Sequence, residues 1–293
     1  MAHSIDRLPP RLAPWRLKLG VKLAVGLLPI PYSLWRRTGL FRHGEMLNPE
    51  YSRQVVRKHT ARAELAPGFV ALELGPGDSV ASGIVASSLG ASQTWLVDTG
   101  RFAEARPDRY QRVWTLLASD PASRLGPWPE PADLLELCSA ARITYLPGGV
   151  AELEAIPPRS VDIAWSHAVL EHVRRAEMPD LFAGLFRIMR DTGTLSHRVD
   201  LADHLSGGLK NLTVPSRRWE RPLVWRSGAY TNRMSVSEIV AAAQSAGFET
   251  EIVEVVRWRE PPISRHELAT EFRSRSDDEL CIRAFDFIAR PKH

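Results

Sequence analysis

The stretch FVALELGPGDS, residues 69–79, decides the fold class of this chain. A short apolar strand pattern over 69–74 runs directly into Gly75 and Gly77. Glycines at the carboxyl end of a first strand let the backbone turn tightly and approach a bound ligand closely. The stretch therefore predicts a strand, a ligand-binding turn and a helix at about 80–89.

Downstream of this turn, short apolar runs alternate with helical patterns. Further strands are expected at 94–98, 143–146, 161–166, 194–199, 249–256 and 282–289. Helices are expected at 103–118, 131–140, 168–176, 179–190 and 236–246. Because parallel strands need helical crossovers, this alternation predicts a doubly wound, mostly parallel α/β sheet.

One connection is much longer than the others. About 35 residues separate the fifth strand from the helix at 236, and residues 201–234 carry six Lys or Arg against Asp203 and Glu220, a net charge of +4. A connection of this length in a compact domain is usually a lid or a binding insertion. We therefore predict that residues 201–234 form a substrate lid.

The N-terminal segment is strongly basic. Residues 1–45 hold eight Lys or Arg against two acidic residues, so the rest of the chain sums to −2. We expect residues 1–60 to be a helical segment that packs on the α/β core, with the basic face outward. The apolar stretch at 23–32 has about half of the roughly 20 residues that a membrane-spanning helix needs. Peripheral membrane contact is the alternative to packing on the domain. The apolar stripe that supports packing consists of Leu19, Leu23, Leu27 and Leu28.

Composition sets further limits. The chain has 293 residues with 44% hydrophobic and 25% charged residues, which excludes a disordered chain or a disulfide-rich miniprotein. Its two cysteines, Cys138 and Cys281, are far apart and lack metal-type spacing. A reducing, cytoplasmic location is therefore expected. The basic N-terminal segment would also allow the protein to associate with a membrane surface from the cytoplasm.

An acidic residue completes the turn. Asp98 ends the second strand pattern, 23 residues after Gly75, and a carboxylate at that position of a doubly wound sheet accepts hydrogen bonds from ribose hydroxyls. The third glycine of a dinucleotide-binding loop would stand where Val80 does. A nicotinamide or flavin dinucleotide is therefore a poor fit.

Four segments together resemble the class I S-adenosylmethionine-dependent methyltransferases. They are ALELGPGDS (71–79), VD (97–98), GGVAELEAIP (148–157) and SVDIAWSHAVLEHV (160–173), in this order and spacing. The resemblance covers roughly residues 70–200. It implies a seven-stranded, mostly parallel sheet, S-adenosylmethionine as the cofactor, and a methyltransferase domain over 61–293.

The resemblance also implies roles for individual residues. Glu73 and the two glycines would lie under the methionine part of the cofactor, Asp98 would bind the ribose, and the segment at 149–152 would line the adenine. Val150 departs from the acid that many members carry there, so Glu152 or a backbone carbonyl would have to contact the adenine amino group. Implied to bind the cofactor are Glu73, Gly75, Gly77, Asp78, Asp98, Thr99, Val150, Ala151 and Ser166.

Methyl transfer to a protonated nucleophile needs a base at the carboxyl ends of the fourth and fifth strands. His167 and His204 are the candidates there, with Asp200 to orient an imidazole and His197 as a further catalytic candidate. His172 is interpreted as part of a helix scaffold. No H-x-x-x-H spacing occurs, so no metal is expected.

The acceptor is expected to be a small molecule or a glycan-type metabolite with an acidic group. Tyr230 and the lid arginines Arg217, Arg226 and Arg233 would bind it, because arginine matches carboxylate and phosphate geometry. A solvated, neutral role for these arginines is the alternative. An RNA or protein methyltransferase and a non-catalytic module with a degenerate cofactor site are the other function classes. No N-P-P-Y motif or RNA-binding module appears, so nucleic acid is not the expected partner. Nothing in the sequence indicates an oligomeric state.

Overall fold

A single seven-stranded sheet organises the chain. The structure is a computed structural model that describes residues 15–26 and 46–292. The strand order is β3-β2-β1-β4-β5-β7-β6. The strands are β1 (Val70–Leu74), β2 (Gln93–Val97), β3 (Ile143–Leu146), β4 (Val161–His167), β5 (Met189–Asp200), β6 (Phe248–Arg257) and β7 (Ile282–Pro291). Strands β1 to β5 pair in parallel, whereas β7 is antiparallel to both β5 and β6. The predicted seven-stranded, mostly parallel sheet is confirmed.

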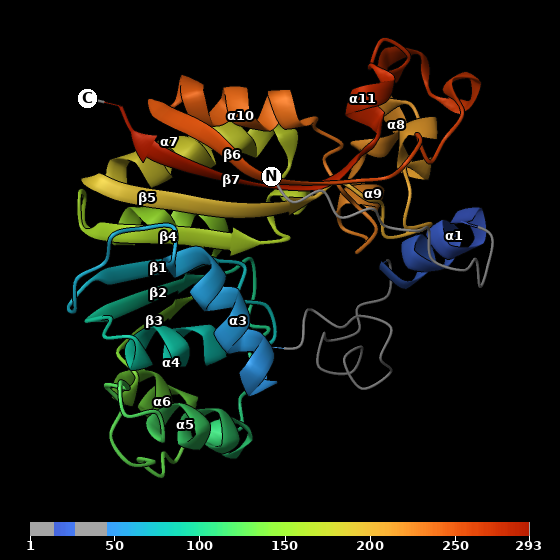
Figure 1. The fold of residues 1–293 in the computed structure, drawn as a ribbon. Coiled ribbons are helices and arrows are strands. Elements are labelled where there is room, and N and C mark those ends of the chain that lie inside the picture. The colour runs from blue at the N-terminus through green and yellow to red at the C-terminus, as the bar shows by residue number, and fades with distance from the viewer. Residues whose placement is uncertain (1–14, 27–45, 293) are drawn as a thin grey trace.

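Helices cover both faces of the sheet (Figure 1). Side chains alternate between the faces along each strand, so Ala71 packs on one face and Leu72 on the other. The Leu72 face is covered by α7 (Met178–Ile188) and α10 (Val236–Ser245). The Ala71 face is covered by α3 (Pro49–Thr60), α4 (Ala81–Ser88), α5 (Gln111–Ala118) and α6 (Leu134–Ala140).

A second, smaller body lies beyond one end of the sheet (Figure 1). It is built from residues 201–234, after β5, and from residues 258–281, between β6 and β7. We call these two segments the lobe. Because β7 runs antiparallel to β5, both segments leave the sheet at the carboxyl end of β5. The sequence-based expectation of one lid missed the second segment. The helices of the lobe are α8 (Ser216–Trp219), α9 (Pro222–Trp225) and α11 (Asp277–Leu280).

The lobe has an apolar core of its own. Leu212 from the first segment packs with Trp258 and Phe272 from the second. All three side chains are buried. The segment expected to be a lid is thus held by packing against a partner segment far away in the sequence.

The N-terminal helix α1 (Trp15–Gly26) packs on the lobe, not on the sheet. Trp15, Leu19 and Leu23 lie against the cluster around Trp219, and α1 contacts α9. This differs from the expectation that residues 1–60 pack on the α/β core. Of the two helices that the structure describes in this range, α3 packs on the core and α1 does not. Leu27, Leu28 and most of the basic segment lie outside the described residues. Within residues 15–26 and 46–292, no helix has the length and apolar character needed to cross a membrane.

The prediction of a helix at 168–176 is wrong. Ala168 takes a left-handed conformation with φ of 58°, which an α-helix cannot contain. Two 3₁₀ turns follow, Leu170–His172 and Arg175–Glu177, with extended backbone between them. The helix expected at 103–118 begins later, as a 3₁₀ turn at Pro107–Tyr110 that leads into α5.

Candidate functional site

The turn after β1 depends on two glycines in the left-handed region. Gly75 has φ of 66° and Gly77 has φ of 69°. The N–H of Gly75 donates to the carbonyl of Val97, at 2.8 Å, which ties the turn to β2. A Cβ atom on Gly75 would lie 2.6 Å from Cγ2 of Val169. A side chain at this position is therefore excluded twice, by the backbone conformation and by the segment after β4.

Asp98 lies opposite this turn at the end of β2. Its Oδ2 accepts a hydrogen bond from the N–H of Gly77 at 2.9 Å, and its Oδ1 accepts one from the N–H of Thr99 at 2.7 Å. Each carboxylate oxygen has two lone pairs, so one acceptor position per oxygen is left after these bonds. Burial raises the pKa of Asp98 to about 6. The carboxylate is thus charged at neutral pH, held in place, and able to accept two further hydrogen bonds, as two ribose hydroxyls require.

Glu73 is buried behind the turn. Its Oε2 accepts a hydrogen bond from the hydroxyl of Ser82 in α4. Burial raises the pKa of Glu73 to about 7, so the carboxyl group is partly protonated near neutral pH. A cationic ligand group next to it would favour the charged form. The position fits the contact to a methionine ammonium group that the resemblance implies.

The segment expected at the adenine adjoins Asp98. The N–H of Gly149 donates to the carbonyl of Asp98 at 2.7 Å. Val150 is partly buried against the α7 side of the core, while Ala151 is exposed and Glu152 folds back over Gly148. The segment implied to line the adenine thus lies next to Asp98, and the apolar Val150 leaves no side-chain acceptor at its own position.

Two aromatic residues that the sequence analysis missed shape the same edge. The hydroxyl of Tyr145 donates to the carbonyl of Gly100 at 2.7 Å and accepts from the N–H of Phe102 at 3.1 Å. The hydroxyl of Tyr110 donates to the carbonyl of Glu104. These bonds fold the chain after β2 into a defined loop. Nothing in the sequence around Tyr110 or Tyr145 indicates that their hydroxyl groups fix this loop.

At the end of β4, His167 meets a histidine from α3. Its Nδ1 lies 3.2 Å from Nε2 of His59, and Nδ1 of His59 lies 2.8 Å from the hydroxyl of Ser196. Burial, followed by the charge of Arg198, lowers the pKa of His167 to about 4. Burial also lowers the pKa of His59 well below its ordinary value. Both rings are therefore neutral at pH 7, and His167 is a weak proton acceptor.

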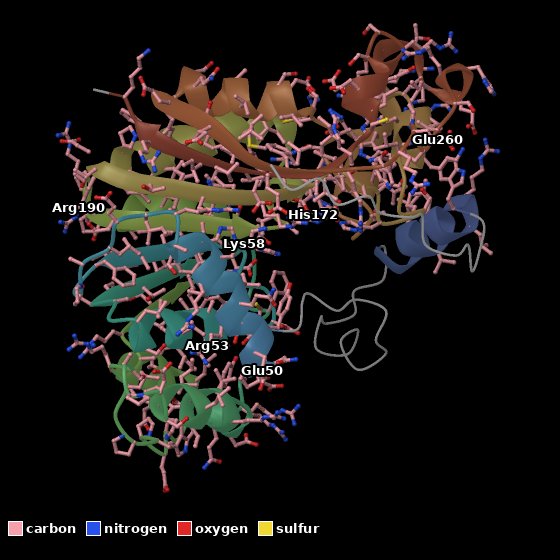
Figure 2. The ribbon with its side chains drawn as sticks, in the orientation of Figure 1. Glu50, Arg53, Lys58, His172, Arg190 and Glu260 are labelled. Atoms are coloured by element: carbon pink, nitrogen blue, oxygen red, sulfur yellow. The ribbon has the colours of Figure 1, made fainter. Side chains whose placement is uncertain are left out.

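His204 pairs with His172, which the sequence analysis had assigned to scaffold. Their Nε2 atoms are 3.1 Å apart and their rings stack at 4.9 Å. Nδ1 of His172 lies 2.9 Å from the carbonyl oxygen of Tyr230, so Nδ1 carries the proton and donates it. Both histidines are exposed, and Figure 2 shows His172 where the sheet meets the lobe. The pair joins the segment after β4 to the segment after β5.

Sequence comparison identifies no relative, since no family model and no curated protein matches. Solved structures of similar fold do exist. The YcgJ protein of Bacillus subtilis is 15% identical, with a TM-score of 0.47 over 83% of this chain and 99% of that chain. A phosphoethanolamine N-methyltransferase of Haemonchus contortus, solved with S-adenosyl-L-methionine, is 15% identical with a TM-score of 0.46 over 83% of this chain and 53% of that chain. An arsenic(III) S-adenosylmethionine methyltransferase of Chlamydomonas reinhardtii is 14% identical with a TM-score of 0.43 over 84% of this chain and 73% of that chain.

The strand order, with β7 antiparallel between β5 and β6, is that of the class I methyltransferase fold. Its seven-stranded mixed sheet carries the glycine turn at the end of β1 and the acid at the end of β2. In this methyltransferase fold, Val80 is fully buried at the start of α4, where a dinucleotide-binding loop would need its third glycine. The valine side chain occupies the place where a dinucleotide-binding loop needs a glycine, which agrees with the sequence-based argument against a dinucleotide.

Two predicted site residues lie inside the sheet and not at its edge. Ser166 and His197 are both 0% exposed, and the hydroxyl of Ser166 lies 2.7 Å from Nδ1 of His197. The ring of His197 packs against Phe182 and Phe287, and burial lowers its pKa to about 3. We therefore correct both assignments: Ser166 does not face the cofactor and His197 does not reach a substrate.

The predicted substrate-binding residues of the lobe divide into buried and exposed ones. Tyr230 is buried and its hydroxyl donates to Glu220 at 2.8 Å. Arg233 is 5% exposed, lies between the rings of Trp219 and Phe272, and donates to the carbonyl of Val214 at 2.6 Å. These contacts hold the lobe together. Tyr230 is bound to Glu220, whereas Arg233 also lines the cavity between the sheet and the lobe. Arg217 and Arg226 are exposed.

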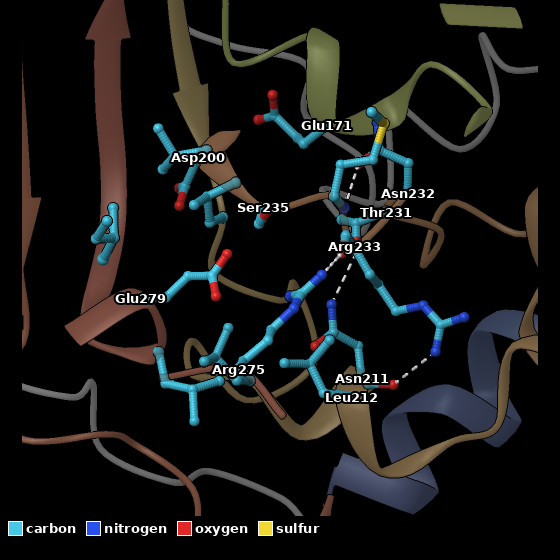
Figure 3. Close-up of a pocket in the computed structure, with 16 residues that line it drawn as sticks. Glu171, Asp200, Asn211, Leu212, Thr231, Asn232, Arg233, Ser235, Arg275 and Glu279 are labelled. Atoms are coloured by element: carbon cyan, nitrogen blue, oxygen red, sulfur yellow. Dashed lines mark hydrogen bonds between the residues drawn. The ribbon is translucent and has the colours of Figure 1, made fainter. Parts of the chain in front are cut away.

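A cavity lies between the sheet and the lobe (Figure 3). Glu171 and Asp200 line it from the sheet end, and Arg275 lines it from the lobe. Burial raises the pKa of Glu171 well above its ordinary value and raises that of Asp200. Oδ1 of Asp200 accepts from the N–H of Ala202 at 2.9 Å. Asp200 thus lines the cavity, and the hydrogen bond from Ala202 holds its carboxylate in place. Among the described residues, no cluster of three His, Cys, Asp or Glu could hold a metal ion.

Proposed function

We propose that this protein binds S-adenosylmethionine and transfers its methyl group to a small-molecule acceptor. The observation that carries the proposal is the carboxylate of Asp98. It is anchored by the N–H groups of Gly77 and Thr99 and has one acceptor position left on each oxygen. Two hydroxyls on adjacent ribose carbons match this arrangement. Glu73 would balance the charge of the methionine ammonium group. S-adenosylmethionine supplies a methyl group that its sulfonium already activates.

The test is calorimetry of the full chain with S-adenosylmethionine and S-adenosylhomocysteine. Asp98→Asn keeps the shape and removes the charge, and Asp108→Asn is its matched control, since Asp108 is an exposed acid in the turn before α5. We expect the first variant to bind at least tenfold more weakly than the native chain and the control to bind equally well. If the native chain binds neither compound, the result would instead support a non-catalytic module with a degenerate cofactor site. NADH should not bind, because Val80 fills the place of the third glycine.

At the acceptor side, the protein must orient the nucleophile, exclude water and take up a proton. The low pKa of His167 makes it a poor base at pH 7, so we assign this role to His204. Nδ1 of His172 donates to the carbonyl of Tyr230, and its Nε2 faces Nε2 of His204. In this proposal His204 takes up the proton, and its Nε2 lies 3.1 Å from Nε2 of His172. His172 is the positioning residue of this pair.

A screen of metabolite extract with isotope-labelled donor would identify the acceptor. On that acceptor, His204→Gln should slow single-turnover methyl transfer by about 10²- to 10⁴-fold, while binding of S-adenosylmethionine stays unchanged. His167→Gln should lower the rate far less. Equal losses in both variants would remove the assignment of His204. An RNA or protein as the labelled product would replace the small-molecule acceptor but leave the cofactor site intact.

A further inference from the structure

An apolar and cationic surface lies on the far side of the lobe. Leu17 is 61% exposed and Val21 is 48% exposed, one turn apart on α1. The opposite side of α1 is the side that packs on the lobe. Leu223 on α9, the helix that α1 contacts, is 43% exposed. We call Leu17, Val21, Leu223 and the exposed arginines of the α8–α9 segment, Arg217, Arg218 and Arg221, the α1–α9 face.

The concentration of apolar side chains there is unusual. In the described part of the chain, seven large apolar residues are exposed, and three of them belong to α1 and α9. The other four are distributed over α5, α6, α7 and β6. Scattered single apolar residues need no explanation, whereas adjacent ones indicate an interaction surface.

The face carries three arginines, and the exposed carboxylate of Glu271 accepts from the N–H of Ser216 beside Arg217. Arg217, Arg218 and Arg221 are exposed, and within the described residues none of them forms an ion pair. The two acids of the first lobe segment are used internally, since Asp203 is buried and Glu220 accepts from Tyr230. The sequence of α1 adds basic residues and contains no acid. The face therefore attracts an anionic surface.

We propose that the α1–α9 face docks the protein on a membrane surface that contains anionic lipid. An apolar helix face rimmed by basic residues inserts its apolar side chains at the level of the headgroups, while the cations contact lipid phosphates. A nucleic acid would use the arginines but leave Leu17 and Val21 in water. The combination of exposed leucine, valine and unpaired arginine on the same face favours lipid. This inference is independent of the proposed methyltransferase activity.

The experiment is sedimentation of the full chain with two kinds of vesicle, pure phosphatidylcholine and phosphatidylcholine with phosphatidylglycerol. We expect binding only to the vesicles with phosphatidylglycerol, and weaker binding at higher salt, because salt screens exposed charges. Leu17→Ser with Val21→Ser should weaken that binding at least tenfold. The triple variant Arg217→Gln, Arg218→Gln, Arg221→Gln should do the same.

Matched controls remove equal charge or apolar area elsewhere. The triple variant Arg109→Gln, Arg112→Gln, Arg124→Gln loses the same charge from exposed positions, and Leu116→Ser with Leu135→Ser loses exposed leucines from α5 and α6. Both controls should bind within twofold of the native chain. Equal loss in the controls, equal binding to neutral vesicles, or no binding to either vesicle would overturn the proposal. So would tight RNA binding that needs the arginines but not Leu17 and Val21. Leu223→Ser alone provides a milder variant if the double substitution on α1 fails to fold, and it should weaken binding severalfold.

Discussion

The backbone N–H of Gly77 donates a 2.9 Å hydrogen bond to Oδ2 of Asp98, which joins the turn after β1 to the end of β2. This bond orients the carboxylate before any ligand arrives. The remaining acceptor positions of Asp98 therefore need little reorganisation to bind two hydroxyls. Preorganisation of this kind lowers the cost of binding.

Cofactor affinity should fall in acid because of Asp98. Burial raises its pKa to about 6, so below that pH the free protein must release a proton before the carboxylate can accept ribose hydroxyls. Between pH 8 and pH 5, we expect the Kd for S-adenosylhomocysteine to rise by about tenfold in total, with most of the rise below pH 6. Asp98→Asn should bind about 1–3 kcal/mol more weakly at pH 8 and lose this part of the pH dependence. An Asp98→Asn variant with the native pH profile in calorimetry would remove Asp98 from the site.

Gly75 and Val169 should be energetically coupled. Gly75→Ala requires a left-handed alanine, which costs about 1–2 kcal/mol, and places its Cβ 2.6 Å from Val169. We expect the single variant to lower the free energy of unfolding by about 2–4 kcal/mol. Val169→Ala removes the clash but not the strain, so a double-mutant cycle in urea should show coupling of about 1 kcal/mol or more. Additive effects would show that the segment after β4 does not constrain the turn.

The charged form of Glu73 should lower the stability of the fold but favour binding of S-adenosylmethionine. Its pKa is raised to about 7 from an ordinary value of 4.5, so the unfolded chain loses the proton first. Stability that the protonated form contributes at low pH is then lost as pH rises from about 4.5 to 7. Glu73→Gln keeps an acceptor for Ser82 and should be more stable than the native chain at pH 8, but not at pH 4. The same variant should bind S-adenosylmethionine more weakly. Urea unfolding at both pH values checks the first expectation; a variant that is less stable at pH 8 contradicts it.

Asp286 holds α3 to the sheet through buried charge. This fully buried carboxylate pairs with Lys58 at 2.8 Å, Arg62 at 2.7 Å and Arg198 at 2.8 Å, and its hydrogen bonds outweigh burial and lower its pKa. Figure 2 shows Lys58 on α3, beside the strands. Asp286→Asn should lower the free energy of unfolding at pH 7 by about 3–5 kcal/mol, because three cations lose a buried charged partner.

The pH dependence of this effect has a definite sign. The folded pKa of Asp286 lies below its ordinary value of 3.8, so the stabilisation is present above about pH 4 and is lost as pH falls through the folded value. The difference between native chain and variant should therefore shrink in acid. Asp191→Asn is the control, because its pair with Arg159 is exposed and should contribute less than about 1 kcal/mol. A similar loss in both variants would show that the buried cluster has no special role.

Arg233 should matter for folding and Arg226 should not. Arg233 is buried between two rings and donates to Val214 and Ser216, and burial lowers its pKa to about 10. Arg233→Ala should reduce the free energy of unfolding by about 2–4 kcal/mol. Arg226→Ala removes only an exposed contact with the Trp225 ring, so its effect should stay under about 1 kcal/mol. Thermal unfolding of both variants distinguishes a lobe clamp from a substrate ligand, since a ligand could be removed without loss of stability.

The sequence by itself determined the strand, the glycine turn and Asp98. These are local features: a left-handed turn needs Gly75 and Gly77 wherever the chain goes next, and an acid at the end of the second strand of a doubly wound sheet lies beside that turn. The alternation of apolar runs with helices also determined the parallel part of the sheet. Each of these conclusions depends on residues that are neighbours in the sequence or on the regular geometry of βα units.

Only the tertiary structure decided what faces the site. His172 and His204 are 32 residues apart, and no periodicity indicates that their rings stack. The sequence treated Arg233 and Tyr230 as ligand contacts because arginine and tyrosine are chemically suited to that role, but packing buried both of them. The second lobe segment had no distinct signal, because its apolar residues form a core only together with residues of the first segment. A side chain's chemistry is written in the sequence, whereas its exposure depends on which distant segment covers it.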